Sequence, residues 1–215
     1  MKARDDLMDS SHFVDLVGRL REELVQQPIG DYRILPKIVF AMYSGGYPME
    51  EIRPVFKDWV RVAATLPSGP TPGEHVRLLS IALMLGVDEE DRANLERMWP
   101  LRREEEPFCA FLADALGVPH PAVKGNGYLW RFFRKVREIP DAVGKEEFLG
   151  GFLKRSWWKT WQGDPDWWSR QAAGPNYCGF WAWEVAGTVK AYGLDDSSFC
   201  DHRFYPKDMA HYLVR

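Results

Sequence analysis

The sequence has no long hydrophobic run and few cysteines. No stretch approaches the roughly 18 apolar residues that a membrane-spanning helix requires, and the charged start, Met1 to Asp6, leads into no apolar segment of the kind found in signal peptides. The three cysteines, Cys109, Cys178 and Cys200, are odd in number and widely spaced, which is typical of free thiols rather than of a disulfide framework. We therefore expect a cytoplasmic protein without a membrane partner.

An excess of basic charge is also lacking. Lys and Arg together number 28, Asp and Glu number 31, and the formal net charge of the 215 residues is −3. A protein that wraps DNA needs a basic face to displace counterions, so direct nucleic-acid binding is disfavoured. A chain of this length is expected to form one domain or two packed halves with a core that needs no disulfides.

Aromatic residues, in contrast, are abundant and regionally concentrated. They make up 14% of the chain, and eight of the ten tryptophans lie between Trp130 and Trp183. Most of these tryptophans have helical spacing and are expected in a core. Trp167 and Trp168 differ, because they fall in the longest irregular stretch, residues 162–176, flanked by Asp164, Asp166 and Arg170. A loop of this length is a functional candidate, and these two rings are candidate anchors for a partner.

The spacing of apolar residues predicts an all-α fold, a compact multi-helix array of about nine to eleven helices in two packed halves. Several helix starts carry capping signals: Ser10 or Ser11, the box formed by Thr71 and Glu74, and Asp88. The apolar stripes lie over residues 13–24, 35–43, 49–63, 76–85, 88–99, 108–116, 129–136, 148–157 and 177–192, and Pro206 begins a last helix.

One internal boundary stands out, the sequence Val118-Pro119-His120-Pro121. Two prolines within three residues resist helix formation and favour an extended chain. We therefore expect an N-terminal helical half over residues 1–118 and a Trp-rich helical half over residues 119–215.

Candidates for chemistry are few. The sequence contains no phosphate-binding glycine loop and no zinc-protease or serine-hydrolase motif. Cys200 beside His202 lacks the context of a thiol nucleophile. A metal-like group consists of Asp201, His202, Asp208 and His211, but histidines bonded to carbonyls or water are the more common explanation.

Glu184 lies within the apolar run 180–186 and allows two interpretations. Burial raises the pKa of a carboxyl group, as in a catalytic acid. The favoured interpretation is a structural carboxylate that accepts a hydrogen bond from a Trp indole, a Tyr hydroxyl or an Arg.

Short acidic groups recur along the chain. Those at residues 88–91 and 104–106 are typical of helix N-termini and solvated faces. Others fall in loops of the aromatic half: Asp164, Asp166, Asp195, Asp196 and Asp201. Since binding loops combine charge with aromatic anchors, this combination predicts recognition of a basic protein.

Three ordered sequence blocks resemble the PoNi family of bacterial immunity proteins. The first is Tyr177-Cys178-Gly179-Phe180-Trp181-Ala182-Trp183-Glu184-Val185-Ala186, the second Tyr192-Gly193-Leu194-Asp195-Asp196-Ser197-Ser198, and the third Phe204-Tyr205-Pro206-Lys207-Asp208. Upstream, Tyr43-Ser44-Gly45-Gly46 is similar to a turn of the family's N-terminal portion, and Trp157-Trp158 falls where an aromatic pair is common. Two positions depart from the pattern, Cys178 before the glycine and Gly187 where a second alanine is usual.

The resemblance implies an all-helical protein without enzymatic activity or cofactor, which binds and neutralises a cognate DNase toxin of the PoNe type delivered by a type VI or related secretion system. Active-site occlusion, allosteric inhibition and disruption of toxin assembly all remain open. The alternative is a carbohydrate-active or metal-dependent hydrolase that uses Glu184, Asp208, His202 or His211 beside a Trp-lined pocket. The expected toxin-binding residues are Asp164, Asp166, Trp167, Trp168, Asp195, Asp196 and Asp201. The motif residues expected to be structural are Gly179, Trp181, Glu184, Gly193, Asp195, Ser197, Tyr205, Pro206 and Asp208.

Overall fold

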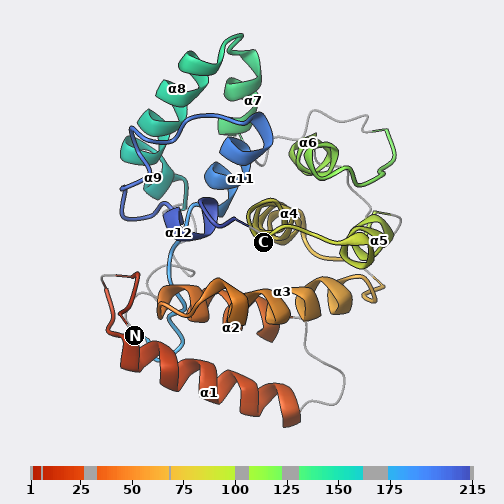
Figure 1. Ribbon diagram of the computed structural model, residues 1–215, viewed down its shortest axis with the longest axis vertical. Coiled ribbons are helices and arrows are strands. Elements are labelled where there is room, and N and C mark those ends of the chain that lie inside the picture. Colours follow the sequence, from red (N-terminus) through yellow and green to blue (C-terminus); the bar gives the residue numbers. More distant parts are fainter. Residues whose placement is uncertain are drawn as a thin grey trace. The chain divides into compact units, whose positions relative to one another are not determined.

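The computed structural model describes residues 2–5, 7–26, 33–67, 69–99, 107–122, 131–161 and 174–213. These ranges contain eleven helices and no strand, which confirms the expected all-α fold (Figure 1). No helix in them is long and apolar enough to cross a bilayer. The helices are α1 (Ser10–Gln26), α2 (Ile34–Ser44), α3 (Met49–Ala63), α4 (Pro72–Leu85), α5 (Glu89–Arg97), α6 (Pro107–Leu116), α7 (Arg131–Glu138), α8 (Ala142–Arg155), α9 (Trp157–Trp161), α11 (Trp183–Tyr192) and α12 (Lys207–Ala210).

The chain divides into two compact units, and each unit is built from two separate stretches of sequence. Unit 1 consists of Met1–Val62 and Lys159–Phe180, and unit 2 consists of Ala63–Trp158 and Trp181–Arg215. The two halves expected from the sequence, residues 1–118 and 119–215, would each be one continuous stretch, which differs from this division.

In unit 1, α1 packs along α2, and its N-terminal cap is Asp9. The Asp9 carboxylate accepts hydrogen bonds from the His12 N–H (3.0 Å) and from the Ser11 hydroxyl (2.7 Å), and these bonds lower the pKa of Asp9. The expected cap, Ser10 or Ser11, was therefore wrong by one or two residues. An aspartate in this position also suits the positive end of the helix dipole.

A late segment of the chain completes unit 1. Tyr177 is fully buried, and its hydroxyl donates to Asp5 Oδ2 at 2.6 Å. The Ser44 hydroxyl at the end of α2 donates to the Cys178 carbonyl at 2.9 Å. The Tyr177 ring also contacts Phe13 of α1, with ring centroids 6.1 Å apart. Residues 174–180 thus tie the N-terminal segment to both helices.

In unit 2, α4 is the central helix and packs against α6 and α11. Its start has the predicted capping box: Thr71 Oγ1 accepts from the Glu74 N–H, and the Glu74 carboxylate accepts from the Thr71 N–H. Asp88 caps α5 in the same way, with Asp91 as its partner. Both capping predictions are confirmed.

The helix expected over residues 177–192 begins only at Trp183. Gly179 has a φ of +100°, which a helix cannot contain, and the backbone of residues 178 and 182 is bonded elsewhere. The Ala182 N–H donates to the Phe204 carbonyl at 2.8 Å. The end of this helix is as predicted, because Gly193 takes the left-handed conformation there. The helix expected over 148–157 also ends early, at Arg155, so that Trp157 begins α9.

Candidate functional site

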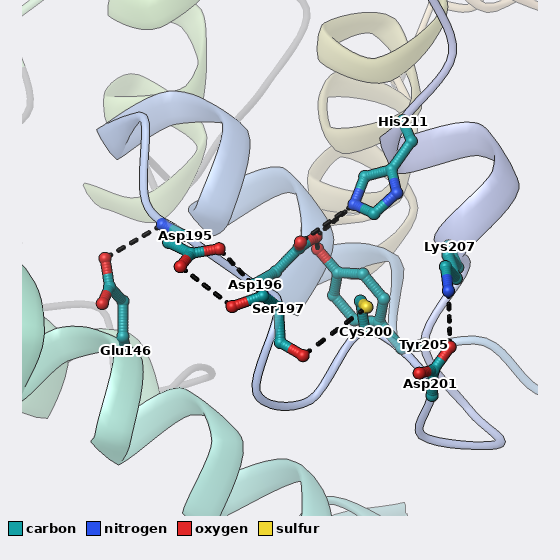
Figure 2. A network of polar contacts seen from close by, with 9 residues as sticks. All are labelled: Glu146, Asp195, Asp196, Ser197, Cys200, Asp201, Tyr205, Lys207 and His211. Atoms are coloured by element: carbon teal, nitrogen blue, oxygen red, sulfur yellow. Dashed lines mark hydrogen bonds and ion pairs between the residues drawn. The ribbon is translucent and has the colours of Figure 1, made fainter.

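Two of the three motif blocks meet in the segment between α11 and α12, which we call the 193–206 loop (Figure 2). The first of its two neighbouring carboxylates, Asp195, is exposed. Asp195 accepts hydrogen bonds from the Ser197 N–H and from the Ser197 hydroxyl, each at 2.9 Å, and these bonds lower the pKa of Asp195. The Asp195 N–H donates to Glu146 Oε1 of α8 at 2.9 Å. The loop thus holds an ionised carboxylate at a fixed place on the surface.

The neighbouring Asp196 is built into the fold. Only 8% of it is exposed, and its Oδ2 accepts the Tyr205 hydroxyl hydrogen bond at 2.6 Å. The same carboxylate lies 2.9 Å from Nε2 of His211 (Figure 2), and the Asp196 carbonyl accepts from the N–H groups of residues 199 and 200. Asp196 therefore fastens the second motif block to the third.

The third acidic residue of this region, Asp201, forms an exposed ion pair. Its carboxylate lies 2.5 Å from Lys207 Nζ, and this hydrogen bond raises the pKa of Lys207. The contact involves two solvent-exposed side chains, so its net contribution to stability is small. Asp201 is consequently accessible to a partner. A cationic group of that partner would replace Lys207 as the neighbour of the Asp201 carboxylate.

The first motif block reaches the same region through buried contacts. Trp157 Nε1 of α9 donates to Glu184 Oε1 of α11 at 2.6 Å, and Glu184 is 1% exposed. An indole was one of the three partners that the structural interpretation of Glu184 allowed. The rings of Trp157 and Trp158 contact that of Phe204, at 4.9 and 5.0 Å between centroids. Glu184 is thus held within the fold.

His202 lies at the edge of this aromatic cluster. Burial is the main cause that lowers the pKa of His202, and the nearby charges of Lys154 and Arg203 lower it further. Its Nδ1 accepts a weak hydrogen bond from the Phe204 N–H at 3.4 Å. The neutral imidazole is therefore the form that fits this position.

The metal-like group does not converge. His211 is bonded to Asp196 and Asp201 to Lys207. No group of three or more His, Cys, Asp or Glu side chains with metal-binding geometry occurs among the described residues.

The other predicted site residues are distributed as follows. Asp164, Asp166, Trp167 and Trp168 lie outside the described residues. Trp181 and Pro206 are buried, Asp208 is exposed, and Gly179 and Gly193 have positive φ. Sequence reasoning grouped Asp196 with its exposed neighbour, and it missed Glu146 and Phe204 as partners of the motif blocks. Nothing in the spacing of these residues signals such contacts.

Residues 122–209 match a family model described as PoNe immunity proteins (PoNi), C-terminal. The match spans α7, α8, α9 and α11 and most of α12, and it contains all three motif blocks. No curated protein matches the chain, and no solved structure matches it.

Proposed function

The chain belongs to the family of PoNe immunity proteins (PoNi), and on this premise we propose that it binds one cognate DNase toxin of the PoNe type directly and neutralises it. The family match over residues 122–209 carries the proposal. The toxin would be one delivered between bacteria by a type VI or related secretion system. Because DNA is cytoplasmic in bacteria, the protein would meet the toxin in the cytoplasm, where its three buried free thiols are stable.

The proposed contact surface includes the exposed carboxylates of the 193–206 loop, Asp195 and Asp201. A DNase binds phosphates through basic side chains, and opposite charge on an inhibitor speeds encounter and fixes orientation. Asp195 suits this role, since Ser197 and Glu146 hold the loop in place. Asp164, Asp166, Trp167 and Trp168 remain part of the proposal on sequence grounds. Asp196 leaves the contact surface, because its carboxylate is used inside the fold.

Inhibition by binding, without catalysis, agrees with the position of Glu184. A glycosidase needs two carboxyl groups about 5 to 9.5 Å apart in an open cleft. Glu184 is almost inaccessible and holds a Trp indole instead, and the candidate metal group has no convergent geometry among the described residues. No observation favours the hydrolase alternative.

Co-expression with the toxin encoded beside it tests the proposal. Growth should be rescued, and the purified protein should form a stoichiometric complex with a catalytically inactivated toxin in size-exclusion chromatography and calorimetry. An interface of about 800 Å² per partner is expected. If the protein binds no nuclease encoded next to it, the proposal is wrong.

The two neighbouring aspartates provide a matched pair of variants. Asp195→Lys, combined with Asp201→Lys, should weaken toxin binding by about tenfold or more and leave the circular dichroism spectrum unchanged. Asp196→Lys should instead lower the melting temperature, since a cation replaces the carboxylate that Tyr205 and His211 contact. Unchanged affinity in the first variant would remove this loop from the interface.

A further inference from the structure

Helix α7 presents an unusual concentration of positive charge. Its eight residues include four basic side chains, all of them exposed: Arg131, Arg134, Lys135 and Arg137. We call these four the basic face of α7. Its three apolar residues are buried on the opposite side. The apolar face of the helix therefore packs into the core of unit 2, and its basic face is exposed to solvent or to a partner.

Little of this charge is neutralised within the protein. Arg134 forms an ion pair with Glu138 at 3.3 Å, and both side chains are about two-thirds exposed (67% and 64%), so the pair is weak. The Arg137 guanidinium lies 5.9 Å from the Phe133 ring centre. Arg131 and Lys135 have no hydrogen-bond or ion-pair partner within the described ranges.

Helix stability explains only part of the arrangement. Arg131 is the first residue of α7, where the helix dipole favours an anion and disfavours a cation. Arg131 and Lys135 are four residues apart, and like charges at this spacing repel each other. Lys135 and Arg137, in contrast, lie in the last turn, where the dipole favours cations. Helix stability therefore leaves the placement of Arg131 unexplained, and a role in recognition would account for it.

The neighbouring helix carries two further basic residues at the end that lies beside the start of α7. Phe132 of α7 stacks on Phe152 of α8, with centroids 4.8 Å apart and planes 12° apart. Since the two helices run side by side in opposite directions (Figure 1), this stack sets the start of α7 beside the end of α8. That end carries the exposed Lys154 and Arg155, of which Lys154 donates a weak hydrogen bond to the Ser198 carbonyl of the 193–206 loop at 3.4 Å. The acidic Glu146 of α8 lies two turns away and is bonded to the 193–206 loop.

We propose that the basic face of α7 binds a cluster of carboxylates on the surface of the cognate toxin. This inference rests on the proposed function and adds a second contact, opposite in charge to the 193–206 loop. Arginine recognises carboxylates through paired hydrogen bonds, and the helix lies inside the family-matched segment. A protein partner fits better than nucleic acid, because the chain as a whole is negative, with a formal charge of −3.

The test uses the double variant Arg131→Glu/Lys135→Glu of the full chain. Its affinity for the inactivated toxin should fall by about tenfold or more, and the affinity of the wild type should decrease with added salt more steeply than that of the variant. Its melting temperature should stay close to that of the wild type, because a glutamate suits the helix dipole at position 131 and opposes it at position 135, and the two charges repel each other in both proteins. This combination separates recognition from folding.

The matched control is Lys37→Glu/Arg92→Glu, the same charge change at two exposed helical positions on α2 and α5. If the wild type binds the toxin and both double variants bind the toxin with the same affinity as the wild type, the α7 inference is overturned while the proposed function stands. If wild type fails to bind the toxin, the proposed function itself fails. If a fluorescent 20-base-pair DNA duplex binds the wild type but not the α7 variant, the face recognises nucleic acid and the inference is wrong.

Discussion

His202 is a single side chain through which pH can act on the 193–206 loop. Its Nδ1 accepts from the Phe204 N–H only while the imidazole is neutral, and its ring lies 5.6 Å from that of Phe204. Phe204 in turn contacts Trp157 and Trp158. Protonation would remove an acceptor at the point where the third motif block joins the aromatic cluster.

The pH dependence of folding should therefore reflect His202. Its pKa is lowered in the folded protein from the ordinary value of 6.5, so the unfolded chain binds the proton more readily. The contribution of His202 to stability is complete above about pH 6.5 and is lost as the pH falls through its folded pKa. His202→Asn keeps an acceptor but does not titrate, and it should flatten the decrease in unfolding free energy between pH 7.5 and 5, measured by urea denaturation. An identical decrease in the variant would contradict this assignment.

At the scale of elements, the contact between α4 and α11 depends on one missing side chain. A Cβ atom at Gly187 would lie 2.4 Å from Ser80 Oγ and 2.9 Å from Ser80 Cα. Ser80 is fully buried, so neither helix can yield without repacking. The close approach of Ser80 accounts for a glycine at this position.

Gly187→Ala should consequently destabilise unit 2, by about 1 to 3 kcal/mol, although alanine is the better helix former. Gly18→Ala on α1 is the matched control, because a Cβ there meets nothing within 4 Å. That variant should gain about 0.5 to 1 kcal/mol. Chemical denaturation of both variants measures the difference. Equal effects at the two positions would show that α4 and α11 are not closely packed.

The elements also show which features a sequence can predict. The caps at Thr71 and Asp88 depend on residues three positions away, and local patterns identified them. The late start of α11 depends on the bond between Ala182 and Phe204, for which no local signal exists. Among site residues, the buried role of Glu184 was anticipated from its apolar neighbours. The burial of Asp196 was not, because Tyr205 and His211 approach it only in the folded loop.

At the scale of the whole molecule, the two units make each part of the chain dependent on distant sequence. Unit 1 needs residues 159–180, and unit 2 needs residues 181–215 as well as 63–158. Fragments divided at the proline-rich boundary, residues 1–118 and 119–215, should therefore fail to unfold cooperatively when heated alone. Calorimetry of each fragment, and of the two mixed, checks this expectation. A sharp transition in either isolated fragment would favour the division at residue 118.

The long return of the chain to unit 1 has a consequence for its synthesis. Tyr177, whose hydroxyl meets Asp5, leaves the ribosome long after α1 and α2 have emerged. At about 5 to 20 residues per second, the apolar surface of these helices waits on the order of ten seconds for its cover. During that interval this apolar surface would be accessible to chaperones, and unit 1, although its first helices are made first, is complete only after residue 180 has emerged. Protection against a toxin would thus start only after translation has passed residue 177.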